Sequence, residues 1–172
     1  MNTPTLDQIL AQGRVSGPES GTLDETLVKL VIFELSGQLF AFPGEKVREI
    51  LAHAQVHFVP GAPPSMEGVV NARGDIETVI RLQARLQLPD PPEQPGPASA
   101  ILLTRGGGVT SGIRVDRVVD VLDLPQSAIV PLPASLPAHW SALTFGMLNL
   151  NDQPVILLDL DVLLGDYARG LG

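Results

Sequence analysis

The apolar residues of this chain come in short runs that end at tight-turn residues. The turns fall at Ser36-Gly37, Arg73-Gly74-Asp75, Gly106-Gly107-Gly108 and Asn151-Asp152. The runs beside them are rich in Val, Ile and Leu, which favour extended backbone. Glycine, asparagine and aspartate supply the backbone conformations that close hairpins. The pattern predicts about ten strands in a mostly antiparallel, all-β protein.

Shorter segments connect the expected strands. Residues 46–51 read as a turn of helix that leads into a strand, and residues 82–88 and 160–167 read as short helices. Five prolines stand among the nine residues 89–97, which therefore form a stiff, exposed connection. This connection predicts two halves of similar strand count. Each half is small, so we expect the two to share a core or an interface.

Composition excludes several classes of function. Apolar residues make up 44% and charged residues 17%, as in globular proteins. The net charge of -8 argues against nucleic acid and anionic membrane surfaces as partners. With no cysteine, disulfides, thiolate zinc sites and cysteine catalysis are excluded. There is no signal-peptide pattern or membrane span, so we expect a soluble, cytoplasmic protein without direct membrane insertion.

Residues 1–26 differ in character from the rest. Thr5 to Leu10 fit one short helix with a capping box, but six residues are too few for a stable isolated helix. Glycine, serine and proline residues follow. We expect a flexible N-terminal tail, with a segment that orders on a partner as the alternative.

A search for catalytic and metal-binding patterns favours a non-enzymatic protein. His53 and His57 have a helical metal spacing but lie in a segment expected to be strand or loop. Asp159, Asp161 and Asp166 lack the glycine and terminal glutamate of a calcium loop. The glycine run lacks the Lys-Ser/Thr of a phosphate loop, and no serine stands in a nucleophile elbow. We therefore expect a binding module without enzymatic activity, cofactor or metal.

Several stretches resemble one protein family. Residues 67–74, Glu-Gly-Val-Val-Asn-Ala-Arg-Gly, resemble the Gly-hydrophobic-x-Asn-Leu-Arg-Gly signature of CheW-like chemotaxis coupling proteins. Further segments of that family are resembled, in the right order, by residues 30–41, 47–50, 111–121 and 154–164. The resemblance covers residues 27–166. The chain departs from the pattern at Ala72, Thr78 and Arg81, and the arginine reverses a charge at the end of a strand.

The resemblance implies a fold and a function. The fold is two small five-stranded (SH3-like) barrels packed together with short helices, which places a CheW-like domain of two barrel subdomains at residues 27–172. The function is that of a non-enzymatic adaptor and scaffold, which ties the cytoplasmic tip of a methyl-accepting chemoreceptor to the regulatory domain of a CheA-type histidine kinase. Such a protein is a monomer alone and assembles with its partners in arrays.

The resemblance also implies which residues contact partners. The receptor- and kinase-binding candidates are Val47, Glu49, Gly68, Val69, Asn71, Arg73, Gly74 and Gly112. Glycines let a partner helix approach the backbone closely, and an arginine offers several fixed donors. In the structural alternative, the glycines serve turns or bulges and Arg73 bonds backbone carbonyls between the barrels, with Glu49 as an internal partner.

One other function stays open from the residues. A β-barrel can bind a small ligand or peptide outside chemosensory signalling. That function predicts a closed apolar pocket with converging polar groups, and a filled barrel interior would count against it.

Overall fold

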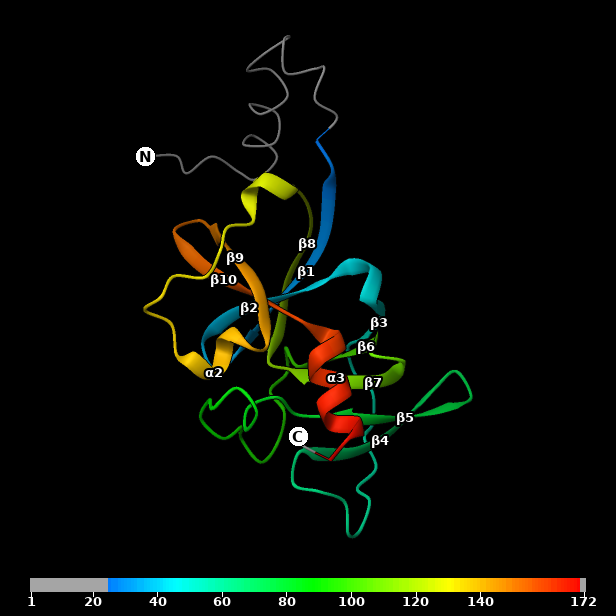
Figure 1. Cartoon of the computed structure of the whole chain (residues 1–172). Coiled ribbons are helices and arrows are strands. Elements are labelled where there is room, and N and C mark those ends of the chain that lie inside the picture. Colours follow the sequence, from blue (N-terminus) through cyan, green and yellow to red (C-terminus); the bar gives the residue numbers. More distant parts are fainter. Residues whose placement is uncertain (1–24, 171–172) are drawn as a thin grey trace.

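The computed structural model describes residues 25–170. The predictions for the N-terminal tail and its short helix lie almost entirely outside these residues. Ten strands form two five-stranded sheets (Figure 1). We call the first the terminal sheet, in the order β8-β1-β2-β10-β9, and the second the middle sheet, in the order β3-β6-β7-β5-β4.

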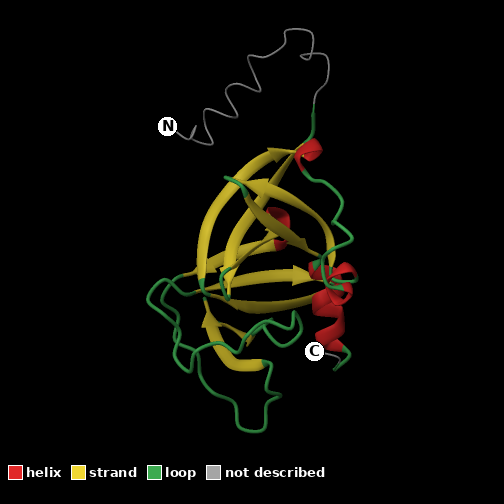
Figure 2. Ribbon diagram, turned by 90° about the vertical axis from the view of Figure 1, so that its left-hand side faces the viewer, coloured by secondary structure: helices red, strands yellow, loops and turns green. Residues whose placement is uncertain are grey.

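The terminal sheet takes its strands from both ends of the described chain: β1 (Leu27–Leu35), β2 (Gln38–Pro43), β8 (Arg117–Pro125), β9 (Thr144–Leu150) and β10 (Gln153–Leu158). The middle sheet consists of β3 (Val47–Leu51), β4 (Met66–Ala72), β5 (Asp75–Ile80), β6 (Ala100–Gly106) and β7 (Val109–Val115). The helices are α2 (Ala138–Ser141) and α3 (Leu160–Ala168). Both sheets are strongly curved (Figure 2), and the predicted all-β class of two five-stranded units is confirmed.

The prediction that the proline-rich connection divides the chain into two halves is wrong. Residues 89–97 join β5 to β6, and both strands belong to the middle sheet. Parallel pairing of β2 with β10 brings the first hairpin against the last strands. Such long-range pairings depend on the burial of apolar faces and not on local turn residues, so the order of turns along the sequence does not reveal them.

The four two-residue hairpin turns share one backbone geometry. Both residues of each turn have positive φ, as in the type I′ turns that match the twist of hairpin strands. The pairs are Ser36-Gly37, Arg73-Gly74, Gly107-Gly108 and Asn151-Asp152. A 3₁₀ turn at Gly44–Lys46 leads into β3, close to the predicted turn of helix. Residues 82–88 form turns and not the predicted short helix.

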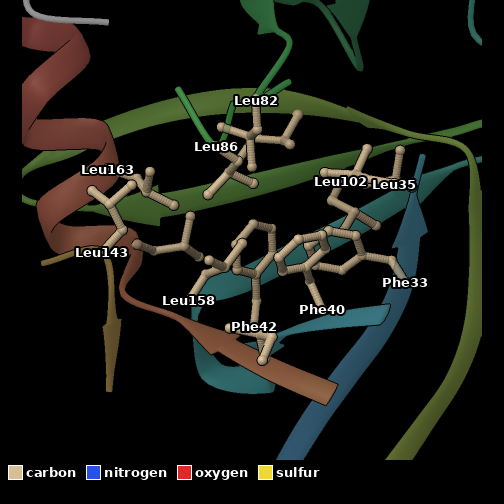
Figure 3. Close-up of a cluster of buried hydrophobic side chains, with 14 of the residues drawn as sticks. Phe33, Leu35, Phe40, Phe42, Leu82, Leu86, Leu102, Leu143, Leu158 and Leu163 are labelled. Atoms are coloured by element: carbon tan, nitrogen blue, oxygen red, sulfur yellow. The ribbon is translucent and has the colours of Figure 1, made fainter. Parts of the chain in front are cut away.

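Three apolar clusters form the core. One lies within the curve of the terminal sheet, around Leu30, Ile32 and Leu157, and another lies within the middle sheet, around Val70, Val79 and Ile101. The largest joins both sheets to α3. Figure 3 shows this shared cluster, in which Phe33, Phe40 and Phe42 pack against leucines from the middle sheet and α3. The expectation that two small units share an interface is confirmed.

Removal of Phe40 tests this shared core. Its side chain is fully buried, and its ring centroid lies 6.1 Å from that of Phe33 and 5.7 Å from that of Trp140. Phe40→Ala is expected to lower the free energy of unfolding by about 3–5 kcal/mol because it opens a cavity. Urea unfolding measures the loss. Phe58→Ala, at a side chain that is 77% exposed, is the control and should change stability by less than about 0.5 kcal/mol. Equal effects would contradict the packing.

Helix α3 connects the two sheets, since it follows a strand of one and contacts the other. It follows β10 of the terminal sheet, and the Asp159 carboxylate caps it by accepting a hydrogen bond from the Val162 N–H. Its side chains then reach the middle sheet. The Asp161 carboxylate accepts from the Gly107 N–H at 2.8 Å, and the Tyr167 hydroxyl donates to the Arg81 carbonyl at 2.8 Å. No helix within residues 25–170 is long and apolar enough to span a membrane.

Candidate functional site

All eight candidate residues lie in the middle sheet or its turn. Val47 and Glu49 stand on β3, three others on β4, Gly112 on β7, and Arg73 and Gly74 form the β4–β5 turn. β3 and β4 are opposite edge strands of this sheet. Yet the Arg73 guanidinium lies 3.1 Å from the Glu49 carboxylate, so the hairpin tip meets the opposite edge. The curl of the sheet thus brings together residues that are far apart in its strand order.

The hairpin tip is built to present Arg73. Arg73 and Gly74 have φ angles of 55° and 91°, which close the turn in two residues. The Asn71 side-chain carbonyl accepts a hydrogen bond from the Gly74 N–H at 2.9 Å and so fixes the turn from within. Asn71 and Gly74 therefore shape the tip, and the arginine side chain projects from it.

The Arg73–Glu49 ion pair lies at the surface. The Arg73 side chain is 83% exposed and that of Glu49 is 29% exposed. An arginine so exposed does not lie between the two barrels, which argues against the structural alternative for this residue. Glu49 is the partner of Arg73 within the chain, and the pair lies at the surface and not in the core. Exposed ion pairs contribute at most about 1 kcal/mol to stability, so Arg73 can exchange Glu49 for another acidic partner.

Gly68 and Gly112 are covered by the chain itself. A Cβ on Gly68 would meet the carbonyl oxygen of His57 and lie 2.9 Å from its carbonyl carbon. The His57 backbone pairs with Val69 through hydrogen bonds of 2.8 and 2.9 Å. A Cβ on Gly112 would lie 2.8 Å from the Ile101 side chain. Both glycines serve packing within the middle sheet, and the space beside them is not open to a partner helix.

Both apolar candidates are half-buried, and the most exposed apolar residue of the site is not among the candidates. Val47 is half-buried against the shared core, and Val69 is half-buried on β4. Ile76, which is 68% exposed, pairs across the strands with Asn71 and shares its face. Alternation in β5 groups Ile76 with Thr78, but sequence alone does not say which face of the strand is covered.

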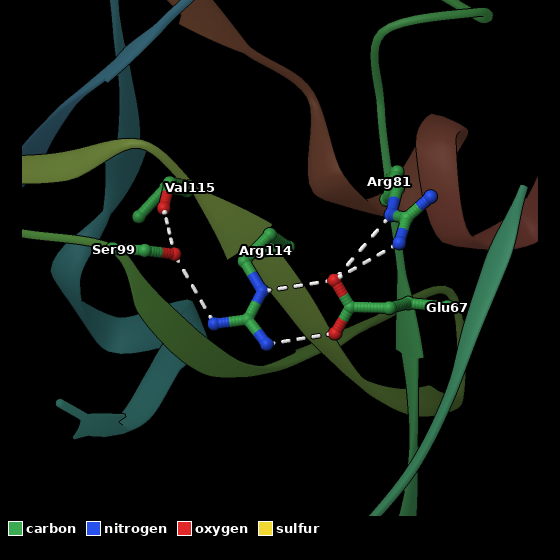
Figure 4. A network of polar contacts seen from close by, with 5 residues as sticks. All are labelled: Glu67, Arg81, Ser99, Arg114 and Val115. Carbon is green, nitrogen blue, oxygen red and sulfur yellow. Dashed lines mark hydrogen bonds and ion pairs between the residues drawn. The ribbon is translucent and has the colours of Figure 1, made fainter. Parts of the chain in front are cut away.

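The base of the same hairpin holds a polar cluster that sequence reasoning also missed. Glu67 near the start of β4 accepts two hydrogen bonds from Arg114 of β7, at 3.1 and 2.7 Å (Figure 4). Arg81, just after β5, contacts the same carboxylate at 3.4 Å. The Ser99 hydroxyl accepts from Arg114 at 3.1 Å and donates to the Val115 carbonyl. Arg81, the departure noted in the sequence, thus has its counter-charge on the other arm of the hairpin.

The groups considered for metal binding have structural partners. Asp159 caps α3, Asp161 accepts from Gly107, and Asp166 pairs with Arg85 and Arg169. Within the described part of the chain, no group of three His, Asp or Glu side chains is placed to hold a metal ion. Side chains also fill the interiors of both barrels, which counts against an interior ligand pocket.

The surroundings of Asp166 predict that the fold loses stability in acid. The Arg85 guanidinium, 2.7 Å away, holds the pKa of this carboxyl below its ordinary value, and Arg169 at 2.6 Å adds to the effect. A lowered pKa stabilises the fold above the ordinary value of about 4, and the contribution is lost as pH falls through the folded value. Urea unfolding between about pH 5 and pH 2 should show falling stability.

Two variants test whether Asp166 causes that fall in stability at low pH. Asp166→Asn is expected to flatten the slope, because an amide cannot take up the proton. Asp152→Asn, in an exposed turn, should leave the slope unchanged. The assignment to Asp166 fails if both variants keep the slope of the unmodified chain.

Comparisons with known proteins agree with this architecture. The family model described as the CheW-like domain matches residues 29–168. The probable chemotaxis protein CheW of Rhizobium etli is 28% identical over 138 residues, which are 80% of this chain and 88% of that protein. The chemotaxis protein CheW of Helicobacter pylori is 26% identical over 164 residues, covering 95% of this chain and 98% of that protein.

A solved structure extends the comparison to the fold. The crystal structure of the scaffolding protein TtCheW from Thermoanaerobacter tengcongensis superposes with a TM-score of 0.70 at 26% identity. The match covers 80% of this chain and 92% of that one. The family model spans both curved sheets and helix α3, including the hairpin that carries Asn71, Arg73 and Gly74. The chain is therefore a member of the CheW-like domain family.

Proposed function

We propose that this chain is a non-enzymatic adaptor that couples chemoreceptors to a CheA-type histidine kinase through protein contacts. The observation that carries the proposal is the exposed Arg73 at a turn that Asn71 and Gly74 hold in shape. This turn contains the signature by which the chain resembles chemotaxis coupling proteins. A fold that exposes its signature arginine, and pairs it within residues 25–170 with a surface carboxylate, keeps that arginine available to a partner.

The surface around Arg73 fits a helix with both acidic and apolar side chains. Ile76 and Val69 offer apolar area, and Glu49 and Asn71 add polar groups. Helix-in-groove recognition uses this mixture. We assign the receptor tip to this surface, and the regulatory domain of the kinase to the remaining barrel surfaces. Gly68 and Gly112 support this surface from beneath and do not contact the partner.

A binding experiment tests the proposal. The purified chain is titrated with the regulatory domain of the CheA-type kinase from the same organism and, separately, with a receptor cytoplasmic fragment. Binding to both in the micromolar range is the expected result. If the chain binds neither partner at micromolar concentrations, the proposal is refuted, and the alternative of a binding module outside chemosensory signalling is left.

A further inference from the structure

A second surface feature lies at the other end of β4 from Arg73. A pocket of about 300 Å³ opens between the 54–58 segment and the proline-rich connection, and Glu67, Arg81 and Arg114 line it. A strand rises about 3.3 Å per residue, so the six steps from Glu67 in β4 to Arg73 just after it place the two residues roughly 20 Å apart. The pocket is thus separate from the hairpin tip.

The charged side chains of the pocket are unevenly paired, because both arginines contact Glu67 and neither contacts Glu93. Arg114 binds Glu67 through two donors, and its third contact is to the Ser99 hydroxyl. Arg81 reaches only the oxygen that already accepts from Arg114, with both contacts at 3.4 Å. One carboxylate therefore faces two guanidinium groups, and Figure 4 shows an Arg81 nitrogen directed away from Glu67. Glu93 also lines the pocket, but forms no ion pair with either arginine.

The wall of the pocket is apolar and unusually exposed. Val56 and Phe58 line it, and the Phe58 side chain is 77% exposed. Phe58 is one of only five phenylalanines, and three of the others are fully buried. The exposed ring beside the charged pocket offers apolar area that a partner can bury, and aromatic and arginine side chains are enriched at protein interfaces.

We propose that this pocket binds a segment of a partner protein in which a Glu or Asp lies next to an aliphatic or aromatic side chain. The carboxylate pairs with Arg81, and the neighbouring apolar side chain covers Phe58 and Val56. A small anion would satisfy Arg81 but leave the aromatic wall in water, so charge and apolar area together favour a peptide. This binding site goes beyond the proposed receptor and kinase contacts and does not depend on Arg73.

A peptide selection tests the proposal. A displayed library of random 12-residue peptides is selected on the full chain, and the enriched peptides are measured by fluorescence anisotropy. The expected result is enrichment of an acidic residue beside an apolar one. Arg81→Gln and Phe58→Ala should each weaken binding by about tenfold, which is about 1.4 kcal/mol. Arg81→Gln leaves Glu67 paired with Arg114, so this variant is expected to fold.

Matched controls define the outcomes that overturn the proposal. Arg105→Gln and Phe145→Ala change an exposed arginine and an exposed phenylalanine elsewhere, and should leave peptide binding unchanged. No enriched peptide, or enriched peptides without a carboxylate, would overturn it. So would loss of binding in Arg73→Glu, which would place the peptides at the hairpin tip. If peptides bind only after residues 1–24 are deleted, the occupant is the chain's own N-terminal segment and not a partner.

Discussion

Arg114→Met is expected to lower the free energy of unfolding by about 3 kcal/mol, and adding Glu67→Gln to that variant should recover most of the loss. The Arg114 side chain is 12% exposed and that of Glu67 is 9% exposed, so water screens their contact poorly. Removal of the arginine leaves a nearly buried carboxylate with only the long contacts from Arg81. This weakly paired charge destabilises the fold more than loss of the ion pair itself.

Urea unfolding of the single and double variants measures this difference. In the double variant the nearly buried carboxylate is gone and the remaining charge, on Arg81, is 30% exposed, so the stability should return to within about 1 kcal/mol of the unmodified chain. Arg117→Met is the control, since Arg117 and Glu34 pair at 2.8 Å with side chains 51% and 26% exposed. Arg117→Met should lower the free energy of unfolding by less than about 1 kcal/mol. A double variant as unstable as the single one would contradict the account of the cluster.

Arg73→Glu is expected to weaken binding to a receptor fragment by at least about tenfold while leaving the fold intact. The side chain is 83% exposed, so the change affects stability by about 1 kcal/mol or less. A partner that presents acidic groups to Arg73 would instead meet a like charge, which costs several kcal/mol at an interface. Isothermal titration calorimetry measures the affinity, and thermal unfolding verifies the fold.

A charge-swapped variant separates the two roles of Arg73. Arg73→Glu combined with Glu49→Arg restores an ion pair within the chain but reverses the charge at the tip. If Arg73 contacts the partner, the double variant folds normally and still binds weakly. If Arg73 only fixes the hairpin, the double variant regains full binding, and the role in recognition is refuted.

The sequence predicts the local parts of this fold well. Each of the four hairpin turns is marked by a glycine, asparagine or aspartate, which tolerate positive φ, and the strands beside them are marked by β-branched side chains. The sequence does not predict the order of strands across the sheets, because β2 pairs with β10 and β5 with β7 over long separations in the chain. These parallel pairings depend on which apolar faces become buried together, and no short motif marks them.

In the candidate site, too, the sequence predicts the local features but not the contacts between distant residues. The resemblance to a family selects the hairpin, and the structure shows an exposed Arg73 that pairs with Glu49, at a turn that Asn71 fixes through Gly74. The resemblance alone does not distinguish contact residues from supporting ones, and it places Gly68 and Gly112 beside Arg73 although the chain covers both glycines. The partner of Arg81 lies 14 positions away across a hairpin, and only the strand register brings the two charges together.

The most direct test of the adaptor function is a reconstituted signalling assay. The chain is added to the CheA-type kinase of the same organism and a membrane-embedded receptor, and the rate of kinase autophosphorylation is measured with and without receptor ligand. The chain should change the rate by about tenfold or more only when the receptor is present, and ligand should reverse the change. A rate that does not depend on the chain, with both partners present and active, would contradict the account.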